Sequence, residues 1–418
     1  MAANGKWWED AVVYQIYPRS FQDSDGDGIG DLAGIESRLD HLAYLGVDAL
    51  WLSPIYPSPL ADMGYDVADH CAIAPELGDL AGFDRLVAKA HSLGLKVLLD
   101  FVPSHTSIEH PWFRDHPEWY IWAEEPPNNW VSAFGGPAWT LDAQKGRYYL
   151  HSFYPEQPDL DWRVPAVRDA MGDVIRFWTG RGVDGFRVDA VQQLMKDPEL
   201  RDDPPATAPF VLPLGDEYGR LEHVHSEAGS DIGVALRAMR AAAGDALLVG
   251  EVYRPTRDLE PYLEHLDLAF AFELLHSPFE EERLAEVVAE GQKLGRVAWA
   301  LSNHDFPRLA TRFGEERAAR AAEFLLSLPE TVFLYQGDEI GMVDGDEADP
   351  PFDRAGRDAH RHPMQWEPEP LGGFTTGEPW LGLTDPMRRS VAAQRGVEGS
   401  SLEEYRRLIA TRRSTVDE

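Results

Sequence analysis

The chain has 418 residues, of which 38 are basic and 72 acidic, so its formal net charge is −34. A surface of this charge repels nucleic acid and anionic lipid, which excludes both as expected partners. Cys71 is the only cysteine, so no intrachain disulfide can form. The N-terminal segment lacks the apolar stretch of a secretion signal, and no run is long enough to span a membrane. We therefore expect a cytoplasmic protein.

Strand-like and helix-like segments alternate along the chain. Residues 33–45 have helical spacing, with Ile35, Leu39 and Leu42 on one face. Further helices are expected at 83–93, 167–179 and 402–413. The strand-like segments are 12–17, 49–52, 96–102, 185–188, 247–252, 268–275, 297–302 and 331–335. Eight strands in this rhythm predict an α/β fold of the closed (β/α)8 type, the TIM barrel.

The alternation is interrupted once, between residues 103 and 165. This segment is rich in Trp, Pro, Asn and Gly and has no helical period. We interpret it as a small inserted domain over the mouth of the barrel, after the third strand. The predicted division is therefore 1–102 for the first part of the barrel, 103–165 for the inserted domain, and 166–418 for the second part with the last helix.

Four apolar runs end in charged residues. They are DFVPSH at 100–105, GFRVDA at 185–190, VGEVY at 249–253 and LSNHD at 301–305. In a TIM barrel the C-terminal ends of the strands form the active-site face, so these carboxylates should meet there. Carboxylates gathered with Arg and His, without a Cys or Ser nucleophile, indicate chemistry on glycosidic bonds.

Each carboxylate also has a purely structural interpretation. Arg187 lies two residues before Asp189, on the same face of the strand, and could keep a nucleophile ionised or form a structural ion pair. Glu251 follows apolar residues, which suits a general acid with a raised pKa or simply a buried glutamate. Asp305 could end a strand in a turn. Three such residues at the ends of three barrel strands favour the catalytic interpretation.

The segment from Asp23 to Asp31 reads DSDGDGIGD. Asp23, Asp25, Asp27, the Ile29 carbonyl and Asp31 follow the ligand spacing of an EF-hand loop. Position twelve of the pattern is a glycine, so the bidentate glutamate of a calcium sensor is missing. We expect a structural Ca²⁺ site, with Mg²⁺ as an option. The alternative is an acidic, glycine-rich turn without metal.

The chain resembles the α-amylase superfamily, glycoside hydrolase family 13, and within it the intracellular α-glucosidase and oligo-1,6-glucosidase group. The resemblance runs from WWEDAVVYQIYPRSF near the start to YRRLIATRR near the end. QPDLDW at 157–162 is similar to a signature in the family's inserted domain. PMQW at 363–366 and FTTGEPW at 374–380 are similar to late signatures of the α-glucosidase group, which also has a metal site matching the 23–31 loop.

The resemblance implies a role for each matching residue. Asp189 would be the nucleophile, Glu251 the general acid/base, and Asp305 the carboxylate that holds sugar hydroxyls as the ring distorts. Residues implied to bind the substrate or transition state are Asp62, Tyr65, His105, Arg187, His304 and Arg357. Among these, Tyr65 would stack on the glucose ring, and Asp62 with Arg357 would close the pocket around the non-reducing glucose.

These roles imply a retaining, exo-acting α-glucosidase that releases α-glucose from short oligosaccharides. Ala190 resembles a position that selects linkage, where a small residue accompanies α-1,4 cleavage, as in maltose, and Val accompanies α-1,6 cleavage. One alternative is a glucosyltransferase or isomerase of the trehalose synthase or sucrose isomerase type, with transglucosylation from the same pocket. A non-catalytic relative is the other. The oligomeric state stays open.

Three features depart from the family pattern. Ser104 stands where Asn is usual before the histidine, and Glu330 stands where Gly is usual before the eighth strand. A charge at that point is expected to strain a tight approach to the strand. The C-terminal β-sandwich domain of the family is expected to be absent.

Overall fold

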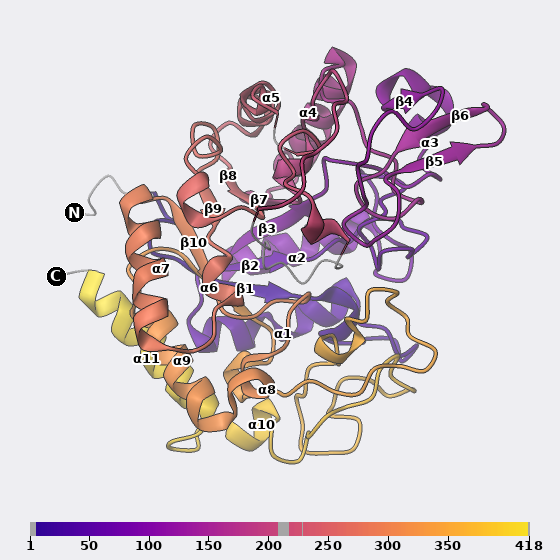
Figure 1. Cartoon of the computed structure of the whole chain (residues 1–418). Helices are drawn as coiled ribbons and strands as arrows, with labels where there is room; N and C mark the ends of the chain where they lie inside the picture. Colours follow the sequence, from indigo (N-terminus) through magenta and orange to yellow (C-terminus); the bar gives the residue numbers. More distant parts are fainter. Residues whose placement is uncertain (1–5, 208–216, 228, 417–418) are drawn as a thin grey trace.

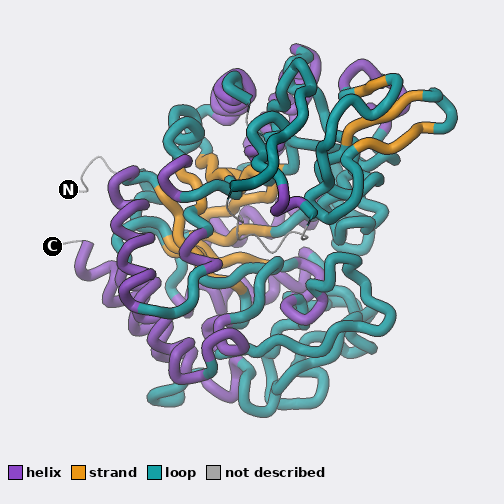
Figure 2. Tube along the Cα trace, in the orientation of Figure 1, coloured by secondary structure: helices purple, strands orange, loops and turns teal. Residues whose placement is uncertain are grey.

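Eight parallel strands form a closed barrel in the order β1-β11-β10-β9-β8-β7-β3-β2. The computed structural model describes residues 6–207, 217–227 and 229–416. The strands are β1 Val12–Ile16, β2 Ala49–Leu52, β3 Lys96–Phe101, β7 Gly185–Val188, β8 Leu247–Gly250, β9 Leu268–Phe270, β10 Val297–Ala300 and β11 Val332–Tyr335. The predicted TIM barrel is confirmed, and Figures 1 and 2 show its strands gathered at the centre with helices around them.

Alternate residues of each strand pack on opposite faces of the barrel wall. In β1, Val13 lies in the cluster that fills the barrel interior, whereas Val12 and Tyr14 pack outward against the helices. In β11, Phe333 points inward and Leu334 outward. Because both faces are buried, these strands are largely apolar, as the sequence indicated, and Gln15 is the buried polar exception in β1.

The helices cover the barrel from outside. They are α1 Leu32–Leu45, α2 Leu80–Ser92, α4 Pro165–Thr179, α5 Ile232–Ala243, α6 Glu273–His276, α7 Glu281–Leu294, α8 Leu309–Phe313, α9 Glu315–Ser327, α10 Val391–Gln394 and α11 Ser401–Val416. Each of the four helices expected from spacing is present. Among the described residues, no helix combines the length and apolar character that a membrane crossing requires.

Several predicted strands extend past the observed ones, among them the strand expected at 297–302, which stops at Ala300. The strand expected at 268–275 stops at Phe270, and the short helix α6 follows from Glu273. The strand expected at 247–252 stops at Gly250, so Glu251 is the first residue of the loop. An apolar run does not reveal where a buried strand ends, because the turn after it is buried as well.

A three-stranded antiparallel sheet is inserted between β3 and α4, as expected. Its order is β4-β6-β5, from Trp122–Ala123, Arg147–Leu150 and Trp139–Asp142, and the short helix α3 Pro111–Asp115 precedes it. Figure 1 shows this sheet projecting from the barrel. The exact residues that divide the three predicted parts stay a prediction.

Glu330 finds a partner at the start of β11. Its carboxylate accepts a hydrogen bond from the indole N–H of Trp299, at 3.0 Å. Trp299 is fully buried, and its N–H needs an acceptor there. The charged side chain therefore satisfies a buried donor of the neighbouring strand β10.

Candidate active site

A cavity of about 580 Å³ opens where the carboxylates of the barrel strands meet. Of the predicted site residues, those that line it are Asp62, Tyr65, His105, Asp189, Ala190, Glu251, Asp305 and Arg357. Arg187 and His304 are completely buried behind this wall. The structure thus brings the predicted catalytic and sugar-binding residues together. Arg187 and His304 lie behind the residues that line the cavity.

Arg187 connects the two carboxylates of the proposed chemistry. One guanidinium nitrogen, Nη1, lies 2.5 Å from Asp189 and 2.8 Å from Asp100, and Nη2 contacts Glu251. Asp100 lies in β3, Arg187 lies in β7, and Glu251 directly follows β8. These three strands are neighbours in the barrel, so their side chains meet at its C-terminal end. The planar guanidinium fork suits this arrangement, because it presents several donors in fixed directions.

Burial raises the pKa of both carboxyls beside Arg187. The pKa of Glu251 rises to about 8 through burial and the nearby Asp189, although the charge of Arg187 opposes the rise. Burial also raises the pKa of Asp189, again against Arg187. Carboxyls that share a buried site do not all ionise freely, so a proton is retained in the group. A protonated Glu251 beside an ionised Asp189 is the state a general acid and a nucleophile require.

Ala190 occupies an unusual backbone conformation directly after Asp189. Its φ of 42° and ψ of 49° place it in the left-handed region, which few residues other than glycine adopt. In this conformation its N–H donates a hydrogen bond to Glu251 Oε2, at 2.9 Å. The methyl side chain lines the cavity.

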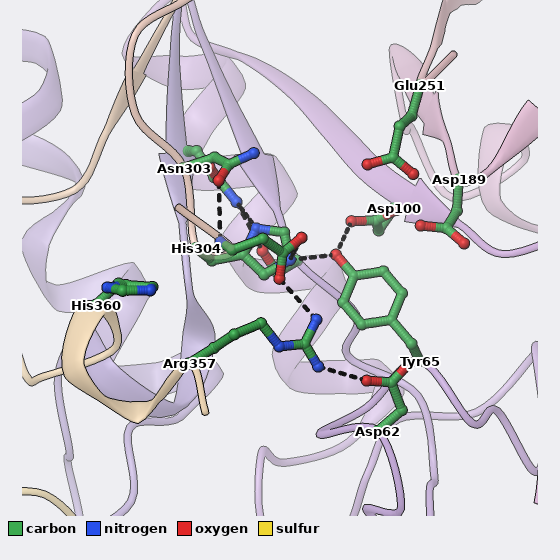
Figure 3. A network of polar contacts seen from close by, with 12 residues as sticks. Asp62, Tyr65, Asp100, Asp189, Glu251, Asn303, His304, Arg357 and His360 are labelled. Atoms are coloured by element: carbon green, nitrogen blue, oxygen red, sulfur yellow. Dashed lines mark hydrogen bonds and ion pairs between the residues drawn. The ribbon is translucent and has the colours of Figure 1, made fainter. Parts of the chain in front are cut away.

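Tyr65, on the cavity wall, stacks on His304, which is buried behind it. Their ring centroids are 5.5 Å apart, and the Tyr65 hydroxyl contacts His304 Nε2 at 2.7 Å. The same hydroxyl donates to Asp100 at 2.9 Å, and Gln15 holds His304 Nδ1 at 2.7 Å (Figure 3). Burial lowers the pKa of His304 to about 3, so the ring is neutral. Tyr65 is thereby fixed as a rigid aromatic face.

An ion-pair network of Asp62, Asp305 and Arg357 lines part of the cavity. Arg357 donates to Asp62 at 2.6 Å, a contact drawn in Figure 3, and to Asp305 at 2.9 Å. Arg361 adds a second contact to Asp305, at 2.9 Å. Burial acts to raise the pKa of Asp305, but His304 and these two guanidinium groups outweigh it and hold the pKa well below its usual range. Asp305 is therefore ionised whenever the protein is folded at neutral pH.

His105 is held by three polar partners at the edge of this network. Ser104, the departure from the family pattern, contacts His105 Nδ1 at 2.8 Å through its hydroxyl. His105 Nε2 lies 3.0 Å from the Tyr65 carbonyl and 3.0 Å from the Gln157 amide. The Gln157 amide also donates to Asp62 at 2.9 Å. A serine at 104 therefore serves as a partner for the histidine.

Several residues of the site were not singled out in the sequence. They are Asp100, Gln157, Tyr253, Asp353, Arg354, His360 and Arg361. Asp100 and Gln157 lie in segments that the sequence marks, DFVPSH and QPDLDW, but their partners are far along the chain. Asp353 binds Arg357 through its Nε at 2.5 Å. Asp353 and Arg357 are four residues apart, but the other contacts join distant segments, and no local pattern reveals those.

Three carboxylates of the 23–31 loop gather as expected. One oxygen each from Asp23, Asp25 and Asp27 lies within 4.8 Å of the others. Asp31 instead caps α1, accepting from Gly34 N at 2.7 Å, and also binds Ser24. Gly28 has a φ of 91°, and a Cβ there would lie 1.9 Å from the Glu378 carbonyl, so the FTTGEPW segment packs tightly on the loop.

The three carboxylates supply the hard oxygen donors that Ca²⁺ prefers. Asp23 already accepts from the backbone of Asp25, Gly26 and Gly28 and from the Thr375 hydroxyl. A carboxylate has about four lone-pair positions, so an ion at Asp23 would take the place of the hydroxyl. With that exchange the residues fit an oxygen-seeking divalent cation.

The fold and the site together define a carboxylate-based glycosidase barrel, and known proteins agree. A family model described as "Alpha amylase, catalytic domain" matches residues 15–417. A probable alpha-glucosidase of Rhizobium meliloti (strain 1021) is 41% identical, over 98% of this chain and 83% of that protein. An oligo-1,6-glucosidase of Parageobacillus thermoglucosidasius is 35% identical, over 97% of this chain and 84% of that protein.

Among solved structures, an alpha-glucosyl transfer enzyme matches with a TM-score of 0.93 and 38% identity, over 98% of this chain and 85% of that one. The chain belongs to the α-amylase family, glycoside hydrolase family 13, in its α-glucosidase and oligo-1,6-glucosidase group.

Proposed function

We propose that the protein is a retaining, exo-acting α-glucosidase that releases α-glucose from short α-1,4-linked oligosaccharides such as maltose. The observation that carries this proposal is the pairing of Asp189 and Glu251 on one guanidinium, Arg187, in a cavity that Asp62 and Arg357 close. A two-step glycosidase needs a neutral carboxyl as the proton donor and an ionised carboxyl as the nucleophile.

The chemistry assigned to these residues has two steps. In the first, the Glu251 carboxyl gives its proton to the glycosidic oxygen while Asp189 attacks the anomeric carbon from the opposite side. The bond to the leaving sugar breaks, and a glucosyl ester of Asp189 forms. In the second, ionised Glu251 takes a proton from water, whose oxygen attacks the same carbon and releases Asp189. Two inversions give α-glucose with retention.

Binding of the non-reducing glucose is assigned to the closed end of the cavity. The ionised Asp305 and the Asp62–Arg357 pair offer hydrogen-bond partners for sugar hydroxyls, and the Tyr65 ring offers a face for stacking. His105 completes the wall from the inserted domain's side. A closed end admits one glucose and no extension of the chain, which supports exo action.

Preference for the α-1,4 linkage rests on Ala190. Its side chain is a single methyl that lines the cavity directly after the nucleophile. A small residue leaves room for a C4-linked leaving sugar, whereas a bulkier one would crowd it and tolerate the longer C6 linkage.

We further propose a structural divalent cation, most simply Ca²⁺, on Asp23, Asp25, Asp27 and the Ile29 carbonyl. The support is the cluster of carboxylate oxygens within 4.8 Å, in the loop between β1 and α1. The ion would contribute stability by tying this loop together. None of these residues lines the active-site cavity, so they take no part in the reaction.

Glucosyl transfer is the second candidate function, and the similarity to the alpha-glucosyl transfer enzyme supports it. The same glucosyl ester would then be attacked by a sugar hydroxyl in place of water. The test is product analysis on maltose, isomaltose, sucrose and trehalose. Free glucose from maltose supports hydrolysis, and isomers or longer sugars as the main products support transfer. No turnover of any of these sugars would overturn both.

A further inference from the structure

Arg354 joins three separate segments at the rim of the cavity. Its guanidinium nitrogens lie 3.2 and 3.0 Å from the two carboxylate oxygens of Glu156, in the inserted segment. One of them also donates to the Ala61 carbonyl, in the loop after β2, at 3.1 Å. The group lies over the Tyr154 ring, 4.0 Å from its centroid. Arg354 itself belongs to the long loop after β11.

Two of these contacts adjoin a residue of the closed end. Ala61 precedes Asp62, and Glu156 precedes Gln157, whose amide donates to Asp62 at 2.9 Å. Because neighbouring residues share the backbone, a shift of Ala61 or Glu156 also moves Asp62 or Gln157.

The loop of Arg354 carries the other half of the closing pair. Asp353, directly before it, binds Arg357 Nε at 2.5 Å, and Arg357 reaches Asp62 at 2.6 Å. Arg354 is therefore a second bridge between the two loops that the Asp62–Arg357 pair connects. It spans them at the rim of the cavity, which it also lines, and the Arg354 side chain is 47% exposed there.

We propose that Arg354 is a positioning residue that holds the closed end of the cavity at the size of one glucose, and so helps to set the preference for short substrates. This rests on the proposed function. An exposed ion pair alone contributes little. Here the Arg354 guanidinium has three partners: both carboxylate oxygens of Glu156, the Ala61 carbonyl and the Tyr154 ring. A guanidinium that contacts both oxygens of a carboxylate fixes the direction as well as the distance between the two groups.

The role predicts a specific kinetic signature. Asp62 and Arg357 are assigned to the end of the reacting glucose that lies away from its anomeric carbon. Weaker contacts at that end reduce the binding of the substrate and of the transition state alike. Such a change raises KM and leaves kcat nearly constant. Arg354 contacts neither Asp189 nor Glu251, so the pH dependence of kcat/KM should not move.

The test compares Arg354→Ala, Arg354→Lys and Glu156→Gln with the unaltered protein on maltose. Glu156 does not line the cavity, so Glu156→Gln can act only through its partner. We expect Arg354→Ala to raise KM roughly tenfold, given the several charge-assisted contacts removed. Glu156→Gln should raise KM by a smaller factor, and Arg354→Lys should recover part of the loss, because lysine keeps the charge without the fork.

Arg114→Ala is the matched control. Arg114 also makes a two-pronged contact with a carboxylate, Asp115, at 2.7 and 2.8 Å, in the inserted segment but away from the cavity. It should leave KM unchanged. An unchanged KM in Arg354→Ala, or an equal fall of kcat in all three variants, would overturn the proposal. Failure of the proposed function would differ, because the unaltered protein would then release no glucose from maltose.

Discussion

The backbone N–H of Ala190 donates a hydrogen bond to Glu251 across two neighbouring barrel strands, at 2.9 Å. Ala190 directly follows Asp189, so the turn after the proposed nucleophile also orients the proposed acid. The bond depends on the left-handed conformation of Ala190, with its φ of 42°. One short turn thereby couples nucleophile, acid and the methyl group assigned to linkage selection.

Removal of either proposed catalytic carboxyl should abolish maltose turnover, by a different route in each case. Asp189→Asn removes the nucleophile, and no glucosyl ester should form. Glu251→Gln removes the proton donor, which typically contributes about 10²- to 10⁴-fold. An aryl glucoside with a good leaving group needs little acid, so Glu251→Gln should still form the ester and hydrolyse it slowly. Trapping the ester by mass spectrometry after a rapid quench distinguishes the two variants.

Near-normal maltose turnover by Asp189→Asn would contradict the whole assignment. Both replacements are close in shape to the residues they replace, so circular dichroism and melting curves serve as the control for folding. Glu251→Gln keeps an acceptor for the Ala190 N–H, and its fold should be retained.

The activity should fall on the alkaline side as Glu251 loses its proton. Burial and the nearby Asp189 raise its pKa to about 8. A general acid works in its protonated form, so the supply of this proton is complete below the pKa of Glu251 and is lost as the pH rises through it. We expect the alkaline limb of kcat/KM for maltose near pH 8, and a much weaker limb with an activated aryl glucoside. An equal limb for both substrates would assign it to another group.

Ala190→Val should shift the linkage preference. Crowding of a C4-linked sugar by one or two methyl groups is worth about 1–3 kcal/mol, or roughly 10- to 200-fold in kcat/KM. Maltose activity should fall by this order, while isomaltose activity holds or rises. The measurement is the ratio of kcat/KM for the two sugars in both proteins. Preference of the unaltered protein for isomaltose would show that another residue sets the linkage.

The same substitution has a predictable cost in stability. A β-branched side chain is disfavoured at the positive φ of Ala190, with a cost on the order of 1–3 kcal/mol. Melting curves of Ala190→Val should therefore shift downward. Ala190→Ser is the control, because it accepts this backbone more readily and adds little bulk.

Chelation should lower the melting temperature and leave the chemistry intact. A ligand that binds only the folded state stabilises it by mass action, about 2.7 kcal/mol at a hundredfold excess over Kd. Chelator treatment followed by calorimetry should show a drop that added Ca²⁺ reverses. Asp27→Asn should give a smaller response to Ca²⁺. An unchanged melting curve together with no metal in elemental analysis would rule the ion out.

Much of the barrel could be predicted from the sequence because its signals are local. A strand buried on both faces is a largely apolar run of consecutive residues, and such a run can be recognised without knowing which strands it pairs with. Asp189 and Glu251 stand out for the same reason, since a carboxylate at the end of such a run is conspicuous. The sequence did not predict that these strands end at Phe270 and Gly250, because the chain remains buried and apolar where it turns.

Only the tertiary structure decided how these residues are joined. Asp100 and Arg187 are 87 residues apart, and Asp62 and Arg357 are 295 apart, so no spacing pattern links them. The loop from Asp23 to Asp31 shows most clearly what spacing alone does not predict. Its spacing indicates Asp31 as a metal ligand, whereas in the structure the Asp31 side chain caps the N-terminus of α1. A sequence records which donors and acceptors exist, but each has several possible partners, and only closure of the barrel brings one of them within reach.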